Sequence, residues 1–130
     1  MKSHKDLEVW KKSIDLVEAI YKLTQGFPKS EQFSLSVQMQ RSAISVPSNI
    51  AEGSGRMSRG DYIRFLYIAR GSLLELDTQL EITKRLGYIS NEQSESISCL
   101  SESVLKMLDG LIFSLKKNVK APLVKECEEG

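Results

Sequence analysis

The chain has 130 residues, of which 41% are hydrophobic and 27% charged, and its formal net charge at pH 7 is +1. This length fits one domain of ordinary soluble composition, and a near-neutral charge alone predicts neither nucleic-acid nor membrane binding. No apolar run approaches the roughly 20 residues that span a bilayer, and the N-terminus lacks the apolar core of a signal peptide. We therefore expect a soluble, cytoplasmic protein with no membrane partner.

The two cysteines give no sign of a disulfide framework or a thiolate metal site. Cys99 and Cys127 form no CxxC pattern, and Cys127 lies in a polar C-terminal segment. A free and buried thiol is the expectation for Cys99.

The first predicted helix covers about residues 6–24. Its apolar residues recur every three or four positions, which is the spacing of one helical face. The main stripe comprises Leu7, Trp10, Ile14, Val17 and Tyr21, widened by Leu16, Ile20 and Leu23. Because Trp10 falls on this stripe, we expect it in the core. Gly26 and Pro28 then break the chain.

The second predicted helix begins near Ser30 or Ser34 and ends at Gly53. Its apolar stripe comprises Leu35, Met39, Ala43, Val46 and Ile50. Pro47 lies inside this pattern and removes one backbone hydrogen bond, so we predict a kink at Pro47. Gly53 and Gly55 are expected to end the helix in the left-handed conformation.

The opposite face of the second helix is polar and comprises Arg41, Ser45, Ser48 and Glu52. Short serine side chains suit close contact with another protein surface better than they suit a solvated face. Since unpaired buried charges are costly, Arg41 and Glu52 would then have charged partners, within the chain or in another subunit. The alternative interpretation is a kinked core helix whose serine-rich face is solvated.

The third predicted helix covers about residues 58–86, and Ser58 with Asp61 three residues later is its capping signal. Its seam keeps the spacing of a left-handed bundle and comprises Tyr62, Leu66, Ala69, Leu73, Leu76, Leu80 and Thr83. Phe65, Ile68 and Ile82 add a second apolar line. The small pair Gly71 and Ser72 predicts that another helix crosses closely there, and Gly87 is expected to stop the helix.

The fourth predicted helix starts at Ser90 or Asn91 and ends about Lys117. Its stripe comprises Ile97, Leu100, Val104, Leu108, Leu111 and Leu115. The sequence from Ala121 onward has no periodicity, and residues 118–130 are predicted to be a flexible tail, which leaves residues 1–117 as the bundle domain. No strand pattern is present. Four amphipathic helices with short connections predict an all-α fold, an antiparallel four-helix bundle.

Catalytic chemistry has little support in this sequence. The single histidine, His4, lies at the N-terminus, where we expect no Ser–His or Cys–His pair. The Glu-x-x-His pairs of di-iron bundles are absent. The glycines at 53 and 55 lack the GxxxxGK[ST] spacing of a phosphate loop. We expect no enzymatic activity, no cofactor and no metal.

The cations are unevenly distributed along the chain. Between residues 41 and 70 every cation is an arginine, whereas twelve lysines and one arginine lie outside this window. The rigid guanidinium fork of arginine suits recognition of carboxylates or phosphates. Candidate contacts with nucleic acid are Arg56, Arg59, Arg64, Arg70, Lys116 and Lys117.

Two stretches, FPKSEQFSLSVQMQRSAISVPSNIAEGSGR and DYIRFLYIARGSLLELDTQLEITKRLGYI, resemble the bacterial four-helix bundle proteins named for the 23S ribosomal RNA intervening sequence. The resemblance covers roughly residues 7–115, and accessory variability proteins of diversity-generating retroelements are similar in fold. It implies a ring-like homopentamer with a central channel and a role in binding RNA or other nucleic acid. The motif positions it carries over are Arg41, Ser45, Pro47, Asn49, Ile50, Ala51, Glu52, Gly53, Arg56, Gly71, Ser72 and Glu75.

Three functional hypotheses follow. The first is a non-enzymatic homo-oligomeric bundle whose assembled surface binds RNA or a ribonucleoprotein. The second is a protein-interaction scaffold whose arginine and glutamate face serves self-assembly alone. The third is an anion or small-ligand site around Arg56 and the adjoining helix end. The candidate interface residues are Arg41, Ser45, Ser48, Asn49, Glu52, Arg56, Gly71, Ser72 and Glu75.

Overall fold

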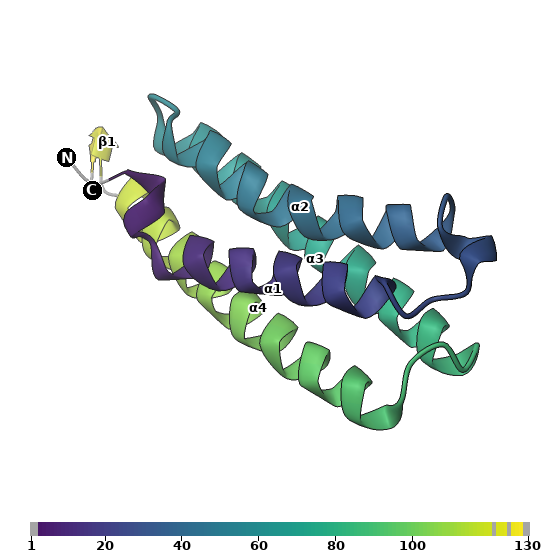
Figure 1. The fold of residues 1–130 in the computed structure, drawn as a ribbon. Helices are drawn as coiled ribbons and strands as arrows, with labels where there is room; N and C mark the ends of the chain where they lie inside the picture. The colour runs from purple at the N-terminus through teal and green to yellow at the C-terminus, as the bar shows by residue number, and fades with distance from the viewer. Residues whose placement is uncertain (1–2, 121, 125, 129–130) are drawn as a thin grey trace.

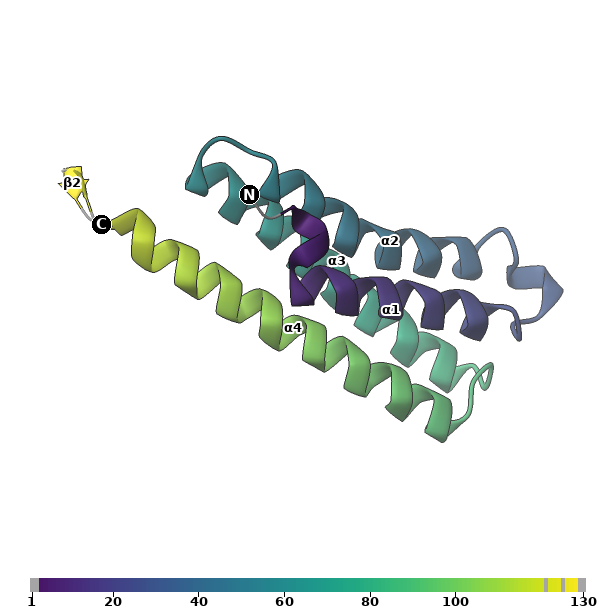
Figure 2. The same ribbon diagram turned by 60° about the vertical axis from the view of Figure 1, so that its left-hand side comes forward.

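The computed structural model describes residues 3–120, 122–124 and 126–128. Its four helices are α1 (Glu8–Thr24), α2 (Leu35–Ser54), α3 (Arg59–Arg85) and α4 (Asn91–Lys120), with short 3-10 helices at His4–Asp6 and Lys29–Glu31. Successive helices run in opposite directions along one bundle (Figure 1). The α2–α3 turn and the C-terminal end of α4 lie at the same end (Figures 1 and 2). The predicted all-α class is confirmed.

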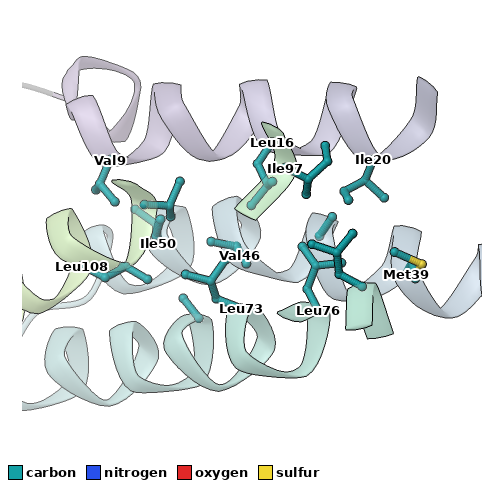
Figure 3. Packing of buried hydrophobic residues seen from close by; sticks show 14 of the residues in the cluster. Val9, Leu16, Ile20, Met39, Val46, Ile50, Leu73, Leu76, Ile97 and Leu108 are labelled. Atoms are coloured by element: carbon teal, nitrogen blue, oxygen red, sulfur yellow. The ribbon is translucent and has the colours of Figure 1, made fainter. Parts of the chain in front are cut away.

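The core forms where the apolar stripes of the four helices meet. Val46 and Ile50 of α2 face Leu73 of α3, with side chains of α1 and α4 closing the other sides (Figure 3). The predicted stripes of α2 and α3 are confirmed in their central positions, because Ala43, Val46, Ile50, Leu66, Ala69 and Leu73 are fully buried. Burial of this apolar surface is the main force that holds the bundle together.

The buried face of α1 is rotated from the predicted one. Val9, Leu16, Ile20 and Leu23 are buried, whereas Tyr21 is exposed and Trp10 only partly buried at the edge of the core. Apolar residues surround much of this helix, so spacing alone did not determine which of them face inward. Cys99 is also exposed and not buried as expected.

The end of α2 differs from the prediction. The helix continues through the buried Pro47 to Ser54, and the kink at Pro47 stays a prediction. Gly55 follows the last helical residue with φ −90°, so the predicted left-handed ending is wrong. Among the described glycines, Gly87 has the positive φ, at 79°, and follows Leu86, the C-cap residue of α3, as the sequence predicts.

The capping serines predicted for α3 and α4 are used, whereas Ser34 at the start of α2 makes no side-chain cap. Ser58 Oγ accepts a hydrogen bond from the Asp61 amide at 3.1 Å, at the start of α3. Ser90 Oγ accepts one from the Gln93 amide at 3.0 Å, at the start of α4. These contacts satisfy amides that the first helical turn leaves without a partner.

The connection between α1 and α2 is tied to the loop between α3 and α4. Tyr88 Oη donates a hydrogen bond to Glu31 Oε2 at 2.8 Å, and the rings of Phe27 and Tyr88 are 5.6 Å apart. Hydrogen bonds from the Ser34 hydroxyl and from Tyr88 hold the pKa of Glu31 below its ordinary value. A hydrogen bond and a contact between two rings therefore hold the α1–α2 connection against the α3–α4 loop.

The chain after α4 contains two short strands. α4 ends at Lys120, three residues beyond the predicted boundary, and β1 (Pro122–Val124) pairs antiparallel with β2 (Glu126–Glu128). The sequence predicts no strand, because three residues are too few to show an alternating pattern. Residues 121, 125, 129 and 130 of the predicted flexible tail lie outside the described residues.

Candidate interface on α2 and α3

Two of the predicted interface residues, Ser45 and Ser72, join α2 to α3 within the chain, and Asn49 bonds to Ser45 from the next turn of α2. The hydroxyl oxygens of Ser45 and Ser72 are 2.7 Å apart, within hydrogen-bond distance. Asn49 Nδ2 donates to the Ser45 hydroxyl at 2.9 Å and to the Ser45 carbonyl at 2.8 Å. Short polar side chains in this part of α2 are therefore explained by contacts inside one subunit.

A groove of about 220 Å³ lies beside this cluster. Arg41 of α2 and Glu75 of α3 line it, together with the buried Ser42 and Gln79. Within the described part of the chain, Gln79 Oε1 is buried without a hydrogen-bond partner, and Arg41 has no carboxylate within 4.0 Å. The groove thus presents the exposed guanidinium of Arg41 and the exposed carboxylate of Glu75, which a second surface of complementary charge would fit.

The two charged residues of the polar α2 face do not pair with each other. Glu52 Oε2 lies 2.5 Å from Arg56 Nη2, one helical turn away, so Glu52 has its charged partner within the chain. Ser48 and Glu52 are exposed in the single chain, whereas Ser45 is partly buried against α3. The sequence predicts that a protein surface covers this polar face. For Ser48 and Glu52, that surface would have to belong to another molecule.

Of the small pair Gly71 and Ser72, where a close helix crossing was predicted, only Ser72 meets α2, through the Ser45 hydroxyl. A Cβ at Gly71 would meet no atom within 4 Å, and Gly71 lies on the exposed side of α3. A Cβ at Gly53 would lie 2.9 Å from Phe65 Cβ and 3.2 Å from the Tyr62 carbonyl oxygen. Gly53 is thus the residue that lets α2 and α3 approach, and the prediction for Gly71 is wrong within the chain.

The outward sides of α2 and α3 remain partly apolar. Ile44 of α2 and Ile68 and Ile82 of α3 are each 40–44% exposed. On α3, Ile68, Gly71, Glu75 and Ile82 follow the spacing of one face. The second apolar line predicted for α3 therefore does not enter the core of the single chain.

The six candidate nucleic-acid contacts gather at the end of the bundle that holds the α2–α3 turn and the C-terminal end of α4. The guanidinium carbons of Arg56 and Arg64 each lie 4.6 Å from the centre of the Phe65 ring. Lys116 Nζ lies 5.0 Å from the centre of the Tyr67 ring and 2.5 Å from its hydroxyl. Lys117 lies in the same way over Phe113, at 5.6 Å.

Carboxylates neutralise part of this basic end. Arg70 Nε lies 2.7 Å from Asp109 Oδ1 of α4, and this hydrogen bond raises the pKa of Arg70. Glu52 pairs with Arg56, and Asp61 lies 3.9 Å from Arg64. Among residues 3–117, whose side chains the structure describes, Arg59, Lys116 and Lys117 have no carboxylate within 4.0 Å. We call these three the free cations of the basic end.

Comparison with known proteins identifies the family. The family described as 23S rRNA-intervening sequence protein matches residues 5–110. The chain belongs to this family. A crystal structure from Bacteroides thetaiotaomicron VPI-5482, titled a protein with unknown function from the S23 ribosomal protein family, has 34% sequence identity and a TM-score of 0.73. The match covers 80% of this chain and 97% of that one. A search of curated proteins found no match.

Two further properties of this 23S rRNA-intervening sequence protein bear on its chemistry. Across the described residues, no helix combines the length and the apolar character that crossing a membrane requires. In that same part of the chain, no three His, Cys, Asp or Glu side chains are grouped so as to hold a metal ion.

Sequence reasoning missed several partners in this family member. Asp109, which pairs with Arg70, is 39 positions away in the chain, and Tyr67 and Lys116 are 49 positions apart. Each lies on the outer side of its own helix, where the periodicity of apolar residues carries no information about pairing. Knowledge of which helices are neighbours was needed to find them.

Proposed function

We propose that this family member is a non-enzymatic, self-assembling helical bundle that binds RNA, bare or within a ribonucleoprotein, through its basic end. The observation that carries the proposal is that four of the candidate cations, Arg56, Arg64, Lys116 and Lys117, lie over the rings of Phe65, Tyr67 and Phe113. Cations bind the phosphate backbone, and aromatic rings beside them offer surfaces on which unpaired bases stack.

The three free cations are the residues most suited to phosphate contacts. Arg59, Lys116 and Lys117 are exposed, and each offers donors that no carboxylate of residues 3–117 occupies. One chain presents a modest positive patch, because the net charge of the protein is +1. Assembly of several chains would place several such patches on one particle, and their potentials would add.

Removing the free cations is expected to weaken RNA binding and its salt dependence. A plot of log affinity against log salt has a negative slope. In the Arg59→Ala/Lys116→Ala/Lys117→Ala protein, each lost phosphate contact makes this slope shallower by about 0.7–0.9. Fluorescence anisotropy of a labelled RNA hairpin with single-stranded ends, recorded over a salt series, measures this slope.

The matched control removes one arginine and two lysines at the other end of the bundle. Lys22, Lys84 and Arg85 are exposed and lie in the last turns of α1 and α3. Their replacement by alanine is expected to leave the slope close to that of the unchanged protein. Equal effects of the two triple variants, or no RNA binding by the unchanged protein at low salt, would contradict the proposal.

A second candidate function is a scaffold that assembles with itself and has no nucleic-acid role. It is favoured by the exposed isoleucines of α2 and α3 and by the groove that holds Arg41 beside Glu75. Partly apolar faces with charged residues among them are typical of contacts between subunits. The pentamer that the family resemblance implies would use this face.

Loss of Arg41 is expected to lower the mass of the assembly. If Arg41 meets a carboxylate of a neighbouring subunit, Arg41→Ala removes one partner of a buried pair, at a cost of roughly 3–5 kcal/mol. Multi-angle light scattering over a dilution series would show the shift towards monomer. Arg85→Ala is the control, since Arg85 pairs with Glu81 on its own helix. An assembly mass unchanged by Arg41→Ala would rule out this role of Arg41.

A further inference from the structure

A hollow of about 530 Å³ lies at the end of the bundle opposite to the basic end. It is formed by the last turns of α1, the connection that follows, and the first turns of α2. Its volume falls within the range of about 300–1,000 Å³ that is usual for small-molecule sites. None of the six cations of the basic end lines it.

A buried hydroxyl without a partner lies in the wall of this hollow. Ser36 is 4% exposed, and its Oγ has no hydrogen-bond partner among the described residues. Buried hydroxyl groups are nearly always hydrogen-bonded, because loss of hydration without replacement is costly. Rotation about the Cα–Cβ bond of Ser36 would be needed for this hydroxyl to bond to a polar atom of a ligand in the hollow.

The start of α2 adds a place for an anion in the same wall. Ser34 makes no side-chain capping bond to the helix, and its hydroxyl donates to Glu31 Oε1 at 2.8 Å. The Glu31 carboxylate faces Ser34, Tyr88 and the Leu35 amide, and it does not line the hollow. The next amides of this 20-residue helix, at Ser36 and Val37, belong to residues that line it, and so does Lys29. Free amides at a helix start favour a negative group.

The remaining wall offers aromatic rings and one oriented amide. Phe33 is 89% exposed and Tyr21 is 40% exposed, and both line the hollow. Gln40 Nε2 donates to Thr24 Oγ1 at 3.0 Å, which leaves Gln40 Oε1 to accept a hydrogen bond. Exposed rings stack on planar bases, and amide side chains bond to base edges.

We propose that this hollow binds a single nucleotide. The base stacks on Phe33 and Tyr21, and the phosphate lies at the start of α2 beside Lys29 and Ser36. A free mononucleotide and an unpaired nucleotide of an RNA strand offer the same chemistry. Since the hollow and the basic end lie at opposite ends of the bundle, this site stands or fails independently of the proposed RNA interface.

Isothermal titration calorimetry on the full chain tests the site. The ligands are the four ribonucleoside monophosphates, adenosine, inorganic phosphate and a single-stranded pentaribonucleotide. At least one monophosphate is expected to bind, and at least about tenfold more tightly than adenosine or phosphate alone, because base and phosphate have separate contacts. If the pentanucleotide binds more tightly than the monophosphates and this binding depends on Phe33, the natural ligand is an RNA strand. If the two bind equally well, the natural ligand is a free nucleotide.

Variants separate this site from other surfaces. Phe33→Ala and Ser36→Ala are each expected to lower monophosphate affinity by about tenfold, and the exposed Phe33 can be removed without disturbing the core. Leu86→Ala is the control, because Leu86 is 53% exposed, follows the last residue of α3 and does not line the hollow. The proposal is overturned if no monophosphate binds at millimolar concentration, or if Leu86→Ala and Phe33→Ala have equal effects. The Arg59/Lys116/Lys117 triple variant should keep monophosphate binding unchanged, which distinguishes failure here from failure at the basic end.

Discussion

Replacing Gly53 with alanine is expected to lower the free energy of unfolding by about 1–2 kcal/mol. The new methyl group would lie 2.9 Å from Phe65 Cβ, 3.0 Å from Tyr62 Cδ1 and 3.2 Å from the Tyr62 carbonyl oxygen. Two of these atoms belong to the backbone of α3 or are bonded directly to it, so they move only if the helices separate. The resulting strain exceeds the gain of about 1 kcal/mol that alanine brings to a helix interior.

Gly110 provides the control for this substitution, because it lies inside α4 and a Cβ there would meet no atom within 4 Å. Gly110→Ala is expected to raise the free energy of unfolding by about 0.5–1 kcal/mol. Urea unfolding of both variants at one protein concentration compares the two. Opposite signs are expected, and stabilisation by Gly53→Ala would show that the helices do not approach as described.

The second large effect is expected from Leu73→Ala, which should lower the free energy of unfolding by about 2–5 kcal/mol. Leu73 is fully buried at the centre of the core, where it faces α2 (Figure 3). Shortening its side chain removes apolar contacts and leaves a cavity that the packed neighbours fill only in part.

The next residue of α3 offers a control of identical chemistry. Leu74 is 42% exposed, so Leu74→Ala is expected to cost about 1 kcal/mol or less. Thermal unfolding by circular dichroism measures both variants. Similar losses at positions 73 and 74 would place the core of α3 on a different face. A loss at Leu74 that grows with protein concentration would instead indicate that Leu74 contacts another subunit.

The capped and strongly periodic segments were predicted well. The third helix was expected at about residues 58–86 and is observed as Arg59–Arg85, with its seam buried from Leu66 to Thr83. Ser58, Ser90 and Gly87 act where the sequence places them, because capping is a contact between residues a few positions apart. Such local signals can be read without knowing the fold.

The prediction was weaker where several faces of one helix were equally plausible. In α1, apolar residues occupy more than half of the circumference, and the side that is buried depends on where α2 and α4 lie. Gly53 was interpreted as a helix end and Gly71 as a close crossing, and the structure reverses these roles in part. A glycine has the same local signature whether it serves a turn or a neighbouring backbone.

The candidate interface also combines local features that the sequence predicts with contacts that depend on the fold. The sequence alone determined four amphipathic helices, their approximate limits and the arginine-rich window, because helical period, capping and composition are local properties. Tertiary structure decided that Ser45 bonds to Ser72, that Arg70 pairs with Asp109, and that the cations of α3 and α4 share one end. These contacts join residues 27–49 positions apart. Their geometry depends on how each helix is rotated and how far it is shifted along its neighbours. Packing of the complete core determines both quantities together.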